Sequence, residues 1–209
     1  MLPREFFARK SLVVAPELLG CLLTARSPEG AVTVRITEVE AYAGSLDAAS
    51  HAYRGRTARN AVMFGPPGHA YVYFIYGMHY AVNVVCMPDG IAEAVLVRAG
   101  EVVDGHALAR ARRPASRSVD GADLARGPGR LASALALSRA QDGADLCEPD
   151  GPLTLAAGKP VEDALIRTGP RVGISRAADL PWRCFLDGEA SVSPYRRAKA
   201  AGPAPEKAC

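Results

Sequence analysis

The sequence predicts a single domain of the mixed α/β class, and three observations lead to this prediction. Short stretches in which apolar and polar residues alternate, the period of a strand with one buried face, recur along the chain. Helical segments bounded by glycine or proline lie between them. The 209 residues contain no internal repeat and no low-complexity linker, and this length can supply one sizeable apolar core.

The first half of the chain is predicted to begin with helices and to continue with strands. Residues 3–19 are expected to be helical, with Ser11 capping a second short helix that ends at Gly20. The segment 43–69 is expected to be mostly loop. The expected strands cover residues 21–25, 31–42, 70–75, 80–86 and 92–99. The strands 70–75 and 80–86 are predicted to form a protruding hairpin.

Shorter helices and strands are predicted for the second half of the chain. A basic helix is expected over 106–113, a polar loop over 114–122, and a helix over about 130–140 that a glycine–proline–glycine turn precedes. Short strands are expected near 153–155, 171–175 and 183–186. We therefore expect one globular domain in residues 1–194 and a basic, disordered tail over 195–209, which is rich in alanine and proline.

The charge is distributed unevenly along the chain. The formal net charge is only +3, but residues 48–88 contain no acidic side chain and hold three of the four histidines. The same stretch carries Arg54, Arg56 and Arg59 in a short loop that also contains glycine. Such a loop is suited to contact with phosphate groups, and an ordinary solvated loop is the alternative.

Several protein classes are disfavoured. The charged N-terminus lacks the apolar stretch of a secretory signal. The longest apolar run, 70–87, alternates and is interrupted by polar residues, which favours two strands over a membrane span. The five cysteines are odd in number and none are spaced as CxxC, which argues against a metal site or a disulfide framework. We expect a cytoplasmic, nucleoid-associated protein.

The strand 31–42 carries the first candidate catalytic residues. Val32, Val34 and Ile36 share one apolar face, and the same alternation would continue it through Glu38 and Glu40. Buried carboxylates are rare unless they are paired or functional, and burial raises the carboxyl pKa as a general base requires. The alternative is that the strand leaves the sheet before Glu38, so that both carboxylates are solvated.

Other polar residues interrupt the predicted strands. Arg98 ends an apolar run, where it could pair with a carboxylate or hold a water or a phosphate. Tyr71 and Tyr73 share one face of their strand, and Asn83 must be hydrogen-bonded if it is buried. Tyr76, near the expected hairpin tip, suggests a side chain that stacks in or wedges nucleic acid.

The turn before the helix near residue 130 offers free backbone N–H groups and the positive end of a helix dipole to an anion. Arg130 follows this turn directly. The motif is weak by itself, since it matches neither a Walker loop nor a dinucleotide fingerprint.

Several blocks of residues follow one another along the chain in a characteristic order. They are EVEAY (38–42), His51, RNAVMF (59–64), Gly68, YVYFIYGM (71–78), Asn83, Arg98, GPGRL (127–131) and RVGI (171–174). In this order and spacing, they resemble the alkyladenine (3-methyladenine) DNA glycosylase family over about residues 10–193. The resemblance implies a mixed α/β domain around a curved antiparallel sheet.

The resemblance also implies catalytic roles. Glu40 would be the general base that activates the attacking water. Arg98 and the backbone carbonyl of Val172 would help to hold that water.

The resemblance further implies a base pocket and contacts to DNA. Tyr42, His51 and Tyr73 would enclose the extruded base, with the backbone of His51 reading its edge. Asn83 would exclude guanine by a clash with its 2-amino group. Tyr76 would enter the minor groove and fill the gap. We expect contacts to the DNA backbone from Arg54, Arg56, Arg59 and Arg130.

The function so implied is removal of alkylated purines from double-stranded DNA by a monomeric enzyme that needs neither cofactor nor metal. No lysine lies between Lys10 and Lys159, so a Schiff-base lyase step lacks an obvious nucleophile. A catalytically silent protein that binds damaged DNA is the main alternative. An O-glycosidase that uses Glu38 and Glu40 is weaker, because residues i and i+2 on one strand lie too close to flank an inverting site.

Overall fold

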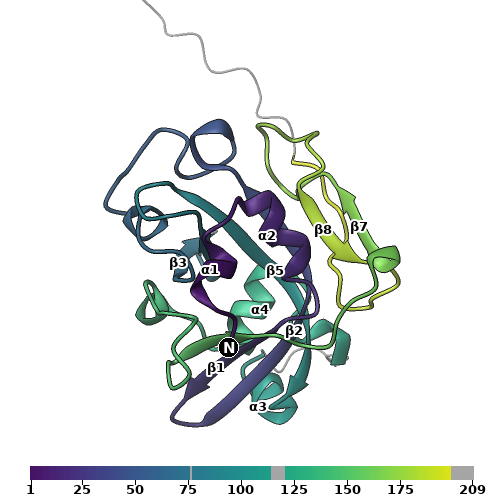
Figure 1. The fold of residues 1–209 in the computed structure, drawn as a ribbon. Coiled ribbons are helices and arrows are strands. Elements are labelled where there is room, and N and C mark those ends of the chain that lie inside the picture. The colour runs from purple at the N-terminus through teal and green to yellow at the C-terminus, as the bar shows by residue number, and fades with distance from the viewer. Residues whose placement is uncertain (76, 114–120, 199–209) are drawn as a thin grey trace, which may run out of the picture.

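A computed structural model gives the fold and describes residues 1–75, 77–113 and 121–198 (Figure 1). One antiparallel sheet has the strand order β3-β4-β5-β2-β1-β6, and β8 joins it by pairing with β2 and with β7. The strands are β1 (Leu22–Ser27), β2 (Gly30–Tyr42), β3 (Ala70–Ile75), β4 (His79–Cys86), β5 (Glu93–Asp104), β6 (Leu153–Ala156), β7 (Ile166–Gly169) and β8 (Arg183–Leu186). This sheet, with its few short helices, confirms the predicted fold class.

The helices of the described residues are short and lie against the sheet. The α-helices are α1 (Arg4–Phe7), α2 (Ser11–Glu17), α3 (His106–Ala111) and α4 (Pro128–Ala134). The 3-10 helices are η1 (Gly44–Leu46), η2 (Ala61–Phe64), η3 (Gly121–Asp123), η4 (Arg139–Gln141) and η5 (Asp163–Leu165). Helix α2 contacts β2 and β5, and α4 contacts β4 and β5, so both help to bury the apolar core. No helix within the described ranges is long and apolar enough to cross a bilayer.

The strands of the hairpin divide their side chains between two faces, as their alternation predicts. Ala70 and Val72 of β3 belong to the main apolar core, whereas Tyr71 and Tyr73 pack with a second, smaller cluster. Strands β4 and β5 repeat this division. The sheet therefore has a core face and an opposite face that carries the aromatic and polar side chains.

The prediction that Glu38 and Glu40 continue the apolar face of Ile36 is wrong. The pairing of β2 with β5 shifts between Ile36 and Val39, where the pairs are Ile36↔Gly100, Glu38↔Ala99 and Val39↔Val97. Because this irregularity moves the alternation by one residue, Val39 joins Ile36 in the main core, and Glu40 points to the opposite face. The expectation of burial is nevertheless confirmed, since both glutamates have 0% exposed surface.

Two predicted elements differ for reasons visible in the backbone. The helix expected over 130–140 ends at Ala134, because Ala136 adopts a left-handed conformation (φ 51°) that turns the buried Leu137 back toward the core. Residues 171–175 are not a strand, and Gly173 there has φ 72°. Ser11 is the first residue of α2 rather than its cap, and its hydroxyl donates to the Glu93 carboxylate.

The predicted hairpin is present, because β3 and β4 pair in antiparallel register from Ala70↔Val84 to Ile75↔His79. Tyr76, to which the wedge role was assigned, lies outside the described residues, as does the part of the expected tail from 199 to 209.

Gly44 begins the turn that leads from β2 into the loop over 43–69. Its φ is +58°, and a Cβ there would collide with the carbonyl oxygen of Ala92. We expect Gly44→Ala to lower the free energy of unfolding by at least about 1–2 kcal/mol, the penalty for an L residue in the left-handed region. Urea unfolding measures this loss. Gly55→Ala is the matched control, since Gly55 also has a positive φ but no atom within 4 Å of the added Cβ. Equal losses in both variants would show that the collision at residue 44 is absent.

Candidate active site

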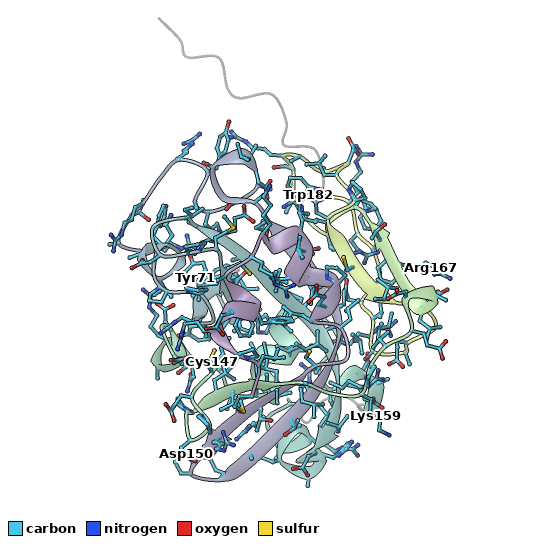
Figure 2. All side chains as sticks on the ribbon, viewed as in Figure 1. Tyr71, Cys147, Asp150, Lys159, Arg167 and Trp182 are labelled. Atoms are coloured by element: carbon cyan, nitrogen blue, oxygen red, sulfur yellow. The ribbon has the colours of Figure 1, made fainter. Side chains whose placement is uncertain are left out.

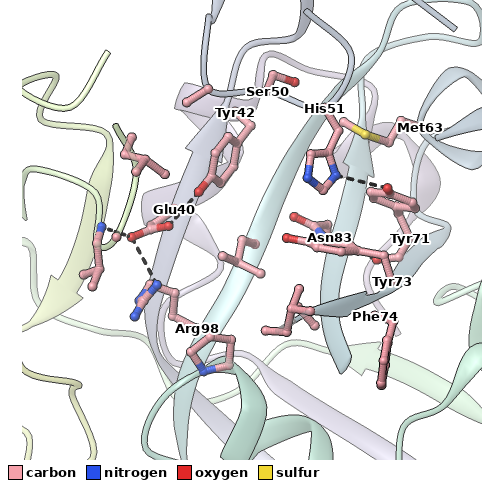
Figure 3. A pocket seen from close by; sticks show the side chains of 18 of the residues that line it. Glu40, Tyr42, Ser50, His51, Met63, Tyr71, Tyr73, Phe74, Asn83 and Arg98 are labelled. Atoms are coloured by element: carbon pink, nitrogen blue, oxygen red, sulfur yellow. Dashed lines mark hydrogen bonds and ion pairs between the residues drawn. The ribbon is translucent and has the colours of Figure 1, made fainter. Parts of the chain in front are cut away.

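A row of four side chains crosses the sheet on the face opposite the core. The cross-strand pairs Tyr71↔Asn83, Asn83↔Leu96 and Leu96↔Glu40 link β3, β4, β5 and β2. A cavity of about 460 Å³ lies against this row, and Figure 3 shows the side chains that point into it. This volume is within the range of about 300–1,000 Å³ that is typical of small-molecule sites.

The cavity gathers residues that are far apart in the sequence. Its walls are formed by Glu40, Tyr42, Ala49, Ser50, His51, Arg59, Met63, Tyr71, Tyr73, Phe74, Ile75, Ala81, Asn83, Leu96, Arg98, Pro128, Val172, Gly173 and Ile174. They include every residue predicted for catalysis or for the base pocket. The structure therefore brings these residues together, whereas Arg54, Arg56 and Arg130 lie outside the cavity wall.

The Glu40 carboxylate is held by donors from three parts of the chain. The Val172 N–H donates to Oε1 over 2.6 Å, and the Tyr42 hydroxyl donates to Oε2 over 2.9 Å. Arg98 Nη1 lies 3.4 Å from Oε1. An ionised carboxylate can accept about four hydrogen bonds, so these partners leave room for a further donor from the cavity.

A second buried carboxylate lies behind Glu40. Glu38 Oε1 accepts from Arg98 Nε at 3.1 Å and from Arg183 Nη1 at 3.0 Å, while Oε2 accepts from the Ser193 N–H at 2.8 Å. Glu38 is therefore occupied by structural partners, and Arg98 bridges the two carboxylates. This geometry leaves only Glu40, of the two, facing the cavity.

The environment of Glu40 opposes its ionisation on balance. Burial raises the pKa of its carboxyl above the ordinary value, and Glu38 raises it further. The charge of Arg98 and the hydrogen bonds from Val172 and Tyr42 offset only part of this increase. A carboxylate with a raised pKa is a stronger base than an exposed one, as proton abstraction from water requires.

Aromatic rings form the remaining walls of the cavity. The rings of Tyr71 and Tyr73 stack at 5.0 Å between centroids, and His51 meets Tyr73 edge-on at 4.6 Å. His51 Nδ1 lies 3.1 Å from the Tyr71 hydroxyl. In Figure 3 the ring of Tyr42 lies between Glu40 and His51, on the other side of the cavity from Tyr71. The walls therefore suit a flat aromatic ligand.

The protonation states of these rings follow from their surroundings. Burial, with Tyr71 nearby, raises the pKa of Tyr73 to about 12, and burial and Glu40 raise the pKa of Tyr42 well above 10. Both hydroxyls therefore remain protonated donors at neutral pH. Desolvation and the charge of Arg59 lower the pKa of His51, which favours the neutral imidazole.

Asn83 is buried, and its Nδ2 donates to the Tyr71 carbonyl over 3.3 Å. This hydrogen bond meets the expectation that a polar residue inside a strand has a partner. The side chain also lines the cavity, where an amide can discriminate between donors and acceptors on a ligand.

The basic residues occupy different environments. Arg59 lines the cavity, with its guanidinium 5.7 Å from the centre of the Tyr73 ring. Arg54 and Arg56 are exposed on the neighbouring loop. Arg130 lies on α4 and forms an ion pair with Asp123 at 2.9 Å.

Sequence reasoning missed several residues that shape the cavity. Tyr71, which the alternation places on one face with Tyr73 but in no site, forms part of its wall, and its hydroxyl lies 3.1 Å from His51 Nδ1. Asn60 fastens the basic loop, because its Nδ2 donates to the carbonyls of His51 (2.9 Å) and Gly55 (3.0 Å). The alternating tyrosines could have suggested the first, whereas the second depends on a loop conformation that no motif encodes.

The described residues contain no group of three or more His, Cys, Asp or Glu side chains placed to hold a metal ion. The cavity instead offers one basic carboxylate, one guanidinium beside it and an aromatic enclosure. Such a site can bind a planar ring and activate a water next to it.

Comparison with known proteins bears on the identity of this site. Residues 5–190 match the family model of methylpurine-DNA glycosylase. A Streptomyces avermitilis protein named "Putative 3-methyladenine DNA glycosylase" is 56% identical over 197 residues, covering 93% of this chain and 92% of its own. Proteins of the same name from Nocardia farcinica (52% identical, 90% and 91% covered) and Leifsonia xyli (52%, 93% and 92%) are also similar.

The raised pKa of Glu40 has a consequence for stability. Because the folded-state pKa lies above the ordinary value of 4.5, the chain should lose stability relative to Glu40→Gln as the pH rises from below 4.5 through the raised pKa. Each unit of increase corresponds to about 1.4 kcal/mol. Urea unfolding of both proteins over a pH series measures the difference, in which the titration of groups that do not interact with Glu40 cancels. A difference that is constant with pH, or a relative gain by the wild type, would contradict the raised pKa.

Proposed function

Because the chain belongs to the methylpurine-DNA glycosylase family, we propose that it removes alkylated purines such as 3-methyladenine from double-stranded DNA. The observation that carries this proposal is the buried Glu40 carboxylate at the wall of an aromatic cavity large enough for a purine. The product is a free base and an abasic sugar.

The target nucleotide must leave the base stack before this cavity can receive it. Extrusion costs a few kcal/mol in unpairing and unstacking, and least where the base is damaged. The basic loop with Arg54 and Arg56 lies beside the cavity wall that Arg59 and His51 contribute, where it can contact the phosphate backbone. We place duplex DNA across this face.

Glu40 is the general base in this proposal. A water bound next to its carboxylate attacks C1′ of the sugar, the N-glycosidic bond breaks, and its electron pair leaves with the base. The proton of the water passes to Glu40, and the carboxylate charge stabilises the oxocarbenium-like transition state. Arg98 and the Val172 N–H both contact Oε1 of this carboxylate, and the Tyr42 hydroxyl donates to Oε2, so the carboxylate is kept in place.

The pocket walls select the base. An alkylated purine such as 3-methyladenine carries positive charge in DNA, and electron-rich tyrosine rings attract a cation by the cation–π interaction. Tyr42 and Tyr73 keep their protons, so both offer neutral rings, while the hydroxyl of Tyr42 donates to Glu40. Asn83, between Tyr71 and Leu96 in the row, is placed to reject a purine with an additional amino group.

The reaction is proposed to end with base release. A covalent lyase step requires an amine nucleophile, and no lysine occurs among the described residues of the cavity wall. The hydrolysis therefore leaves an intact abasic strand.

Glu40→Gln tests the catalytic assignment. We expect excision of 3-methyladenine in single-turnover assays to fall by about 10²–10⁴-fold, the usual contribution of a general base, while binding to abasic-site DNA is retained. Glu101→Gln is the matched control, because it removes a carboxylate of β5 that is exposed and pairs with Arg35. Full activity in Glu40→Gln would remove the general-base role. A wild-type protein that binds lesion DNA but releases no base would instead support the alternative of a damaged-DNA-binding protein.

The absence of a lyase step predicts the outcome of chemical trapping. Borohydride added during excision should yield no covalent protein–DNA band on a denaturing gel, because no imine forms without an amine nucleophile. A lysine-dependent lyase run in parallel checks that the trapping works. A trapped band with this protein would show that the reaction proceeds through a covalent intermediate.

A further inference from the structure

A second ion pair lies beside the catalytic carboxylate and has no part in the roles proposed so far. Arg171 and Asp47 form a two-pronged pair in which Nη2 donates to Oδ1 over 2.9 Å and Nη1 contacts Oδ2. Both side chains have 0% exposed surface. A buried ion pair contributes little more to stability than apolar residues of the same shape, so its presence here suggests another purpose.

Arg171 contacts both of the groups that hydrogen-bond Glu40. It directly precedes Val172, whose N–H donates to Glu40 over 2.6 Å. Its guanidinium also lies over the Tyr42 ring, 4.6 Å from the centroid, and Tyr42 donates the second hydrogen bond to Glu40. Trp182 covers the guanidinium from another side at 5.0 Å, near β8 in Figure 2.

The pair also fixes two segments to the end of β2. Arg171 Nη1 donates to the Ala41 carbonyl over 2.9 Å, so the guanidinium is tied to the strand that carries Glu40. Asp47 accepts from the Ala49 N–H over 3.0 Å and shapes the turn that leads to His51. The segment with Val172 belongs to no strand. The Gly173 N–H donates to the Arg196 carbonyl over 3.0 Å, and these side-chain contacts supply the link between the segment and β2.

We propose that Asp47 and Arg171 are positioning residues that hold the Val172 N–H against the Glu40 carboxylate. This inference rests on the proposed function of Glu40 as the general base. Neither residue touches the substrate in this account, and each acts through the backbone of residue 172 and the ring of Tyr42.

The effect can be measured on Glu40 itself. Its carboxylate faces Tyr42 and Glu38 on β2, Arg98 on β5, Tyr73 on β3 and the Val172 N–H. Of these, the Val172 and Tyr42 hydrogen bonds depend on Arg171, and both favour the ionised form. Loss of the ion pair should therefore raise the pKa of Glu40 further.

The experiment replaces both charges together, because removal of one would leave the other buried and unpaired. In the Asp47→Asn/Arg171→Met double variant, we expect the acid limb of single-turnover excision to move up by about one pH unit. At a given pH on that limb, the excision rate of the double variant is then about tenfold lower than that of the wild type. The carboxyl pKa of Glu40, followed by carbon NMR in the free protein and assigned with Glu40→Gln, should move by the same amount. Arg171→Lys, which retains the charge and should remain folded, is expected to give a smaller shift in the same direction.

Two controls separate positioning from general destabilisation. Arg167→Met/Asp187→Asn removes an exposed pair of the same chemistry, 3.0 Å apart, and Arg167 lies on β7, away from Tyr71 in Figure 2. Leu155→Ala lowers stability from a buried position on β6. Both should leave the acid limb and the Glu40 pKa unchanged.

The proposal is overturned if the acid limb and the Glu40 pKa of the double variant stay at the wild-type values. If the double variant does not fold, the same outcome in Arg171→Lys overturns it. If the wild type itself releases no base, the proposed function fails. The NMR titration of the free protein then still decides whether the ion pair positions the Val172 N–H.

Discussion

The Glu40 carboxylate is the group on which the arrangement of the site depends, because a charge without exposed surface must find its partners inside the protein. Its donors come from β2, β5 and the segment after β7, which are far apart in sequence. Folding must bring all three together if the carboxylate is to stay charged once it is buried. The same convergence forms the cavity, so the proposed general base and the cavity arise together.

The irregular pairing of β2 with β5 makes this convergence possible. Without it, regular alternation would place Glu38 and Glu40 in the apolar core with Ile36. With it, Val39 and Ala41 complete the core, and the two glutamates face a layer of arginines and backbone donors. A shift of pairing at the functional site is a common use of such irregularities. The two carboxylates then differ in position, because Glu38 is enclosed by Arg98, Arg183 and the Ser193 N–H, whereas Glu40 lines the cavity and can meet a water there.

Much of the fold and of the candidate site could be predicted from the sequence, since alternation identifies strands and the polar residues that interrupt them. Only the fold shows that Asn83 and Arg98 lie on the same face as the two tyrosines of β3, whereas the shared face of Tyr71 and Tyr73 followed from period two alone. The face of Glu40 did not, because a shift in pairing leaves no mark in a period-two pattern. The Asp47–Arg171 pair joins residues 124 positions apart, so only the folded chain shows it.

We propose that an extruded alkylated purine occupies the cavity beside a water held by Glu40. The most direct measurement is a crystal structure of the protein with duplex DNA whose alkylated nucleotide carries a 2′-fluorine that prevents hydrolysis. We expect the base between Tyr42 and His51, with a water about 2.6–3.2 Å from the Glu40 carboxylate and facing C1′. A base that remains stacked in the duplex, or a water bound away from Glu40, would contradict it.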